Sequence, residues 1–154
     1  MRVRDLVRAP AVVVSRRTTI AVAAKTLGDA GVGSLVVVDN GQVVGIVTDR
    51  DLVLRAMATR MPLDVAIDVV MTPDVVTIEA EDSLDDVYAT FRRVAFRRLP
   101  VVDPADGRRV IGVLAVDDLM LDVTRRLHDL SGPVADEILM PHRESPFPVP
   151  IQMS

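Results

Sequence analysis

Residues 45–52 read Gly-Ile-Val-Thr-Asp-Arg-Asp-Leu, which is typical of a strand that ends where a helix begins. The pattern returns at residues 112–119, which read Gly-Val-Leu-Ala-Val-Asp-Asp-Leu. Both copies keep the first glycine, the apolar strand end, the second aspartate and the final leucine. A repeat within one chain decides its architecture, so the sequence predicts two copies of one structural unit.

The similarity between the copies extends far upstream of this motif. Pro10 and Val12 return as Pro73 and Val75, and the strand pattern of residues 35–39 returns at 99–103. The spacing between copies grows only in loops, where insertions cost little. We therefore predict a first domain over residues 1–60, a second over 61–130 and a proline-rich tail over 131–154. One such unit alone would be marginally stable, so the two should share a core.

The composition excludes several classes of function. With 154 residues, 49% apolar residues and 3% aromatic residues, the chain should be globular with an aliphatic core. The absence of cysteine excludes disulfides, thiolate catalysis and thiolate metal sites, and a net charge of −4 argues against general nucleic-acid binding. No apolar run is long enough to span a membrane and the first residues lack a signal-peptide core, so we expect a cytoplasmic protein without a membrane partner.

Hydrophobic periodicity and turn signals predict the order strand, helix, strand, strand, helix in each copy. The Asn-Gly pair at residues 40–41 favours a tight hairpin, and strands joined by a helix pair most easily in parallel. In the first copy we expect strands at 11–15, 35–38 and 43–47 and helices at 20–30 and 49–58. In the second copy we expect strands at 75–78, 99–102 and 109–114 and helices at 83–94 and 116–128. The tail, with five prolines, should be extended, packed on the repeats or on a second chain, or disordered.

The motif at 45–52, the strand at 98–103 and the segment at 70–78, repeated in the same order, closely resemble a tandem pair of cystathionine β-synthase (CBS) domains, or Bateman module. The resemblance covers residues 1–128 and implies an α/β (α+β) fold, in which two repeats pack through their sheets about a pseudo-twofold axis. It also implies clefts between the repeats that bind AMP, ADP, ATP or S-adenosylmethionine. Such pairs commonly associate into dimers, so a homodimer is expected.

By this resemblance, Asp51 would hold the ribose hydroxyls and Thr48 would face the phosphate. The chemistry is reasonable, because a carboxylate can accept two hydrogen bonds from a vicinal diol and a helix N-terminus attracts phosphate. The alternative is that both side chains only cap the helix, since Thr-x-x-Asp is a variant of the capping box.

The second copy keeps the aspartate as Asp118 but has Ala115 in place of Thr48. Arg97 and Arg98 stand at a strand start that faces the cleft in the family, where they would contact phosphate; alternatively, they form a solvated face. Gly33 and Ser34 hold the equivalent place in the first copy, which makes the two clefts chemically unequal. The remaining implied ligand contacts are the walls of the adenine site, Val12, Val13, Val75 and Val76.

No catalytic set is assembled, because His128 and His142 lack partner carboxylates and no nucleophile or phosphate-binding glycine motif is present. We therefore predict a regulatory module rather than an enzyme, with no metal and no required cofactor, which senses an adenine nucleotide and signals to an unidentified effector protein. The alternative prediction is a ligand-free scaffold for dimerisation and interaction.

Overall fold

The computed structural model describes residues 1–7 and 10–139, with side chains of the last helix described up to residue 131. Residues 1–116 form one compact unit, which holds both sheets, and a second unit begins at Asp117. The two units are described separately below.

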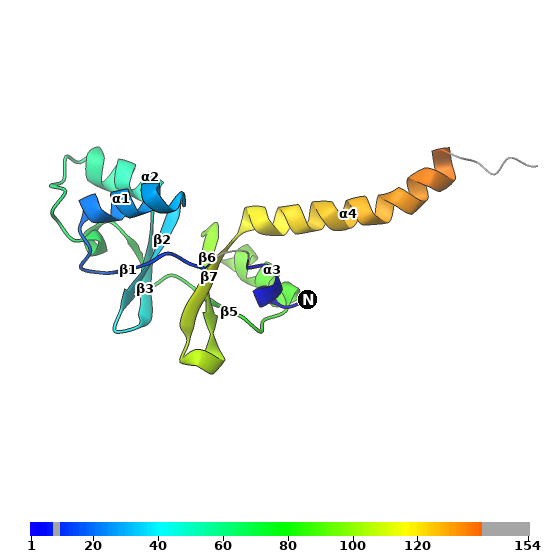
Figure 1. Ribbon diagram of the computed structural model, residues 1–154, viewed down its shortest axis with the longest axis horizontal. Helices are drawn as coiled ribbons and strands as arrows, with labels where there is room; N and C mark the ends of the chain where they lie inside the picture. The colour runs from blue at the N-terminus through cyan, green and yellow to red at the C-terminus, as the bar shows by residue number, and fades with distance from the viewer. Residues whose placement is uncertain (8–9, 140–154) are drawn as a thin grey trace, which may run out of the picture. The chain divides into compact units, whose positions relative to one another are not determined.

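Two sheets correspond to the two sequence repeats (Figure 1). The first has the order β1 (Val13–Ser15), β2 (Ser34–Asp39), β3 (Gln42–Thr48) and β4 (Thr72–Pro73). The second has the order β5 (Ile78–Glu79), β6 (Arg98–Asp103) and β7 (Arg109–Ala115). The predicted pairing is confirmed, because β1–β2 and β5–β6 are parallel whereas β2–β3 and β6–β7 are antiparallel.

The two hairpins turn differently. Between β2 and β3, Asn40 and Gly41 have φ values of 49° and 77°, as a two-residue turn of the primed type requires. Between β6 and β7 the longer loop contains a short 3-10 helix, η4 (Pro104–Asp106), followed by Gly107 with φ 57°. The extra loop residues explain why the spacing between the repeats increases at this point.

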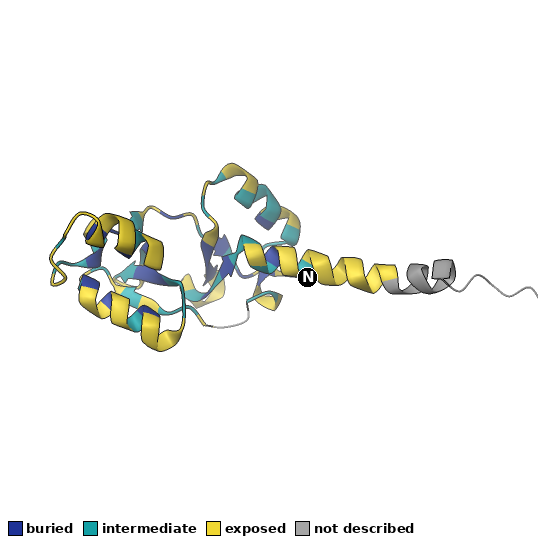
Figure 2. Ribbon diagram, turned by 90° about the horizontal axis from the view of Figure 1, so that it is seen from above, coloured by how far each residue is buried: buried dark blue, intermediate teal, exposed yellow. Residues whose placement is uncertain are grey.

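Helices cover one face of the first sheet. Helix α1 (Ile20–Ala30) starts at Thr19, whose hydroxyl accepts a hydrogen bond from the amide of Val22, and ends at Gly31 with φ 62°. The single helical turn α2 (Asp49–Asp51) continues into a π-helix, η2 (Leu52–Met57). Helices and strands enclose an aliphatic cluster that includes Ile20, Ala23, Leu27, Leu35, Val37, Val47, Leu52 and Ala56. Figure 2 shows these buried strands beneath the exposed outer faces of the helices.

Each repeat is completed by the segment that leads into the other one. The 3-10 helix η3 (Ile67–Val69) leads into the second repeat, yet Ile67, Val70 and Met71 are buried in the core of the first. Conversely, the 3-10 helix η1 (Val3–Asp5) precedes the first repeat, yet the amide of Val3 donates to the carbonyl of Asp82, 3.1 Å away. The lead-in segments are therefore exchanged between the repeats.

Glycines at equivalent positions make room for this exchange. A Cβ atom on Gly45 would lie 2.6 Å from the carbonyl oxygen of Thr72 and 2.7 Å from the sulfur of Met71. A Cβ atom on Gly112 would overlap the side chain of Val7. The glycine shared by both motifs is thus required by the close approach of the other repeat's lead-in segment.

The second repeat is closed by helix α3 (Leu84–Arg93), which begins at Ser83, and by helix α4 (Val116–Leu139). Three predictions about these and neighbouring elements were wrong. Helix α4 continues past His128 through Pro133, because a proline removes one helical hydrogen bond without necessarily ending the helix. The helix predicted at 49–58 is mostly π-helical. The strand predicted at 75–78 is short, and β4, which pairs with β3, forms just before it. The rest of the tail lies outside the described residues.

Candidate functional site

The helix start at Thr48 is a complete capping box. The amide of Asp51 donates to the Thr48 hydroxyl at 3.1 Å. In return, Oδ2 of Asp51 lies 2.9 Å from both the amide nitrogen and the hydroxyl oxygen of Thr48. These bonds satisfy the free amides of the first helical turn. They also commit one oxygen of the Asp51 carboxylate and leave Oδ1 outside the capping box.

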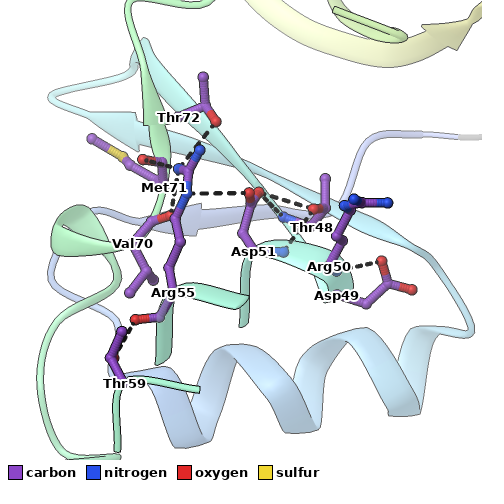
Figure 3. A network of polar contacts seen from close by, with 9 residues as sticks. All are labelled: Thr48, Asp49, Arg50, Asp51, Arg55, Thr59, Val70, Met71 and Thr72. Atoms are coloured by element: carbon purple, nitrogen blue, oxygen red, sulfur yellow. Dashed lines mark hydrogen bonds and ion pairs between the residues drawn. The ribbon is translucent and has the colours of Figure 1, made fainter. Parts of the chain in front are cut away.

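Arg55 lies between that oxygen and the lead-in segment of the second repeat (Figure 3). Its Nε atom is 3.7 Å from Oδ1 of Asp51. Its Nη1 atom is 3.0 Å from the carbonyl oxygen of Val70, 3.1 Å from that of Met71 and 3.3 Å from the hydroxyl of Thr72. One guanidinium therefore joins the helix start to the strand β4.

A hollow of about 280 Å³ opens beside this helix start, and both repeats line it. The first repeat contributes the strand end and the helix start, and the second contributes β4 and the segment that precedes β6. The lining residues are Ile46, Thr48, Asp49, Arg50, Asp51, Thr72, Ala95, Phe96, Arg97 and Arg98. The side chain of Asp51 is 15% exposed, so its carboxylate borders the hollow while remaining largely shielded.

Positive charge predominates around the hollow, where three arginines face two aspartates. Asp49 accepts a hydrogen bond from the backbone amide of Arg50 at 2.8 Å. A Cβ atom on Gly33 would lie 3.7 Å from Nη2 of Arg98 and 3.8 Å from a carboxylate oxygen of Asp49, so Arg98 extends toward the first repeat. Guanidinium groups in this setting suit a ligand that carries phosphate.

The structure brings four of the predicted site residues together. Thr48, Asp51, Arg97 and Arg98 line the same hollow, although they come from different repeats. Gly33 lies beside Arg98, and Ser34 pairs with Thr48 across β2 and β3. Asp118 lies in the first turn of α4, in the second unit, and its predicted role stays a prediction.

The four valines predicted to enclose an adenine are placed elsewhere. Val12 packs against the core of the first repeat, and Val13 and Val76 are exposed. Val75 lines a separate, smaller hollow with Arg108. Among the described residues around the larger hollow, the apolar surface comes instead from Ile46, Ala95 and Phe96.

Sequence reasoning did not select Ile46, Arg50, Thr72 or Phe96 as site residues. Two signals could have found some of them. Arg50 lies inside the Thr-x-x-Asp motif, and Phe96 directly precedes the two arginines. Thr72 could not have been found from local pattern, because it reaches the hollow only through its pairing with β3.

Two further classes of site were searched for over residues 1–7 and 10–139. That part of the chain contains no group of three or more His, Cys, Asp or Glu side chains that could hold a metal ion. Nor does it contain a helix with the length and apolarity needed to cross a lipid bilayer.

Comparison with known proteins agrees with the two-repeat organisation. The profile of the CBS domain matches residues 3–57 and again residues 65–124. The chain is 31% identical over 120 residues to the CBS domain-containing protein YhcV of Bacillus subtilis, covering 78% of this chain and 84% of that protein.

Solved structures of CBS domain pairs superpose on the chain. The CBS domain pair of protein MJ0100, in complex with 5′-methylthioadenosine and S-adenosyl-L-methionine, aligns with a TM-score of 0.69 and 28% identity, covering 82% of this chain and 98% of that one. The CBS domain protein PAE2072 from Pyrobaculum aerophilum, complexed with AMP, aligns with a TM-score of 0.67 and 28% identity, covering 77% and 90%. The predicted fold class is thereby confirmed, and the chain belongs to the CBS domain family as a tandem pair of CBS domains.

Proposed function

We propose that this CBS pair is a regulatory module that binds an adenine nucleotide or a related adenosyl ligand in the hollow beside Thr48 and Asp51. The observation that carries the proposal is the composition of that hollow. A shielded carboxylate and a helix start from one repeat border the same space as Arg97 and Arg98 from the other.

Each part of a nucleoside phosphate has a suitable partner there. Oδ1 of Asp51 lies outside the capping box and can accept hydrogen bonds from a ribose diol. The arginines offer planar donor groups to phosphate oxygens. Ile46 and Phe96 supply apolar surface for a base. The ligands carried by the MJ0100 pair and by PAE2072 share the adenosine group, which supports this class of ligand.

The regulatory role follows from how such a hollow is built. Because both repeats line it, a ligand that fits one arrangement of the repeats better than another would shift the population toward that arrangement. A partner protein, or a second copy in a homodimer, would then detect the change. CBS pairs are regulatory rather than catalytic in general, and we propose the same for this chain.

Thermal unfolding with AMP, ADP, ATP and S-adenosylmethionine tests the proposal. A ligand at a hundred times its dissociation constant should stabilise the native state by about 2.7 kcal/mol, which raises the melting temperature by several degrees. No shift with any of the four compounds would contradict nucleotide sensing.

A second candidate function is a ligand-free interaction scaffold. Two observations favour it: Thr48 and Asp51 already satisfy each other, and apolar side chains are exposed on α1 and η2. Those side chains are Val22, Val53, Leu54 and Met57, which are 51–67% exposed. A scaffold would show an association that depends on these residues and no response to nucleotide.

A further inference from the structure

Arg55 is the one side chain that contacts lining residues of both repeats without bordering the hollow itself. It approaches Oδ1 of Asp51 through Nε and the hydroxyl of Thr72 through Nη1, at 3.7 and 3.3 Å. Asp51 and Thr72 both line the hollow, one from each repeat. Arg55 thus fixes two walls of the hollow relative to each other, as Figure 3 shows.

The geometry around Asp51 shows why this contact matters for a ligand. Oδ2 receives two donors from Thr48, which fixes one end of the carboxylate. Rotation about the remaining axis would still change where Oδ1 points, and Arg55 is the cation beside that oxygen. A ribose diol needs Oδ1 in one direction, because hydrogen bonds weaken steeply when they are misaligned.

Arg55 is itself held in place. Nη1 shares its two hydrogens among three acceptors, namely the carbonyl oxygens of Val70 and Met71 and the hydroxyl of Thr72. It leaves from the π-helix η2, in which the amide of Ala58 bonds to the carbonyl of Val53, five residues earlier. π-helical turns occur mostly in short stretches and frequently at functional sites.

We propose that Arg55 is a positioning residue that orients the Asp51 carboxylate toward the ribose hydroxyls of the ligand and connects that carboxylate to the lead-in segment of the second repeat. The inference rests on the proposed nucleotide site and adds a residue that touches no ligand atom. A hydroxyl pair bound at Oδ1 would compete with Arg55 for the same oxygen, so occupancy of the ribose site would be transmitted to residues 70–72.

Discrimination between riboses tests this role better than affinity alone. Wild-type protein should bind AMP at least tenfold more tightly than 2′,3′-dideoxy-AMP, because the dideoxy compound offers no hydroxyls to a charged acceptor. In Arg55→Met this ratio should fall to about two, since Oδ1 loses its orientation while the arginines that suit phosphate remain. Arg55→Lys should give an intermediate ratio, because an ammonium group keeps the charge but cannot span Asp51 and the three acceptors. Isothermal titration calorimetry measures all three.

Arg16 provides the matched control. It also joins the first repeat to the second repeat's lead-in segment, with Nη1 3.3 Å from Asp39 and Nη2 3.4 Å from Asp68, but it does not line the hollow. Arg16→Met should lower the melting temperature and leave the AMP to dideoxy-AMP ratio unchanged. This comparison separates loss of a structural link from loss of carboxylate orientation.

The other outcomes each reject a different statement. An unchanged ratio in both Arg55 variants would overturn the positioning role and leave the nucleotide site intact. A wild-type protein that binds AMP and dideoxy-AMP equally would overturn the inference by removing the ribose from Asp51. A wild-type protein that binds no adenosine compound would overturn the proposed function, and the role of Arg55 with it.

Discussion

The two repeats share a fold but contribute opposite chemistry to the hollow. The first supplies a hydroxyl and a shielded carboxylate at Thr48 and Asp51, and the second supplies Arg97 and Arg98. At the equivalent positions the first repeat has Gly33 and Ser34, and the second has Ala115 in place of threonine. Duplication thus provided two similar halves, and their later differences allow one hollow to hold both ends of an asymmetric ligand.

A second comparison separates helix capping from ligand binding. Ser83 and Asp86 form a capping box with the same pattern of bonds as Thr48 and Asp51. Its hydroxyl and carboxylate are exposed at the start of α3, whereas Asp51 borders the hollow. The motif alone therefore describes a helix start, and its position at the edge of the other repeat makes it a candidate site.

The largest effect is expected where the repeats meet most closely. Gly45→Ala should destabilise the fold by about 3 kcal/mol, because its Cβ would press on the backbone of Thr72. Gly112→Ala should cost less, since only the side chain of Val7 must move. Urea unfolding compares the two variants. As a control, Gly28→Ala in α1 has open space and should stabilise by up to about 1 kcal/mol. Equal losses at positions 45 and 112 would contradict the difference between the repeats.

Loss of the shielded carboxylate should be the next largest effect. Asp51→Ala should weaken adenine-nucleotide binding about thirtyfold, or about 2 kcal/mol, because the ribose loses a charged acceptor. Calorimetry measures the change. Asp86→Ala removes the matching capping residue of α3 and should leave the affinity unaltered, so a similar loss in both variants would indicate a general effect of helix capping.

The cations of the second repeat should matter only for charged ligands. Arg98→Leu should weaken AMP binding about tenfold through loss of a charge-assisted hydrogen bond. It should not affect 5′-methylthioadenosine, which carries no phosphate. Arg93→Leu, at the end of α3, serves as the control for net charge. If the affinity for 5′-methylthioadenosine fell equally, Arg98 would act by shaping the hollow and not by binding phosphate.

The smallest effect concerns the exposed capping box. A hydrogen bond from the Ser83 hydroxyl, supported by one from the Ser83 amide, holds the pKa of Asp86 below its usual value. Its stabilising contribution is complete above the usual carboxyl pKa and is lost as the pH falls through the lowered value. Asp86→Asn should therefore flatten the acid limb of the stability curve slightly, as measured by urea unfolding between about pH 5 and pH 2. An unchanged acid limb would indicate that the exposed pair contributes no measurable stability.

Local patterns were sufficient to predict much of the fold. Helix α1 has the predicted bounds, and the Asn-Gly hairpin forms where the sequence places it, because both depend on neighbouring residues. Features set by distant contacts were missed, among them the pairing of β4 with β3 and the exchange of lead-in segments. The site shows the same division. Thr48 and Asp51 follow from a motif, whereas Thr72 and Phe96 join them only through tertiary structure.

The exchange of lead-in segments makes each repeat incomplete without its neighbour. A fragment that ends at residue 60 lacks Ile67, Val70 and Met71, which fill the first core. Expressed alone, it would expose a hydrophobic gap and should aggregate or recruit the missing strip from another molecule. Selection can therefore add or delete such repeats only as couples, which makes the couple, and not the single domain, the unit of inheritance in this architecture.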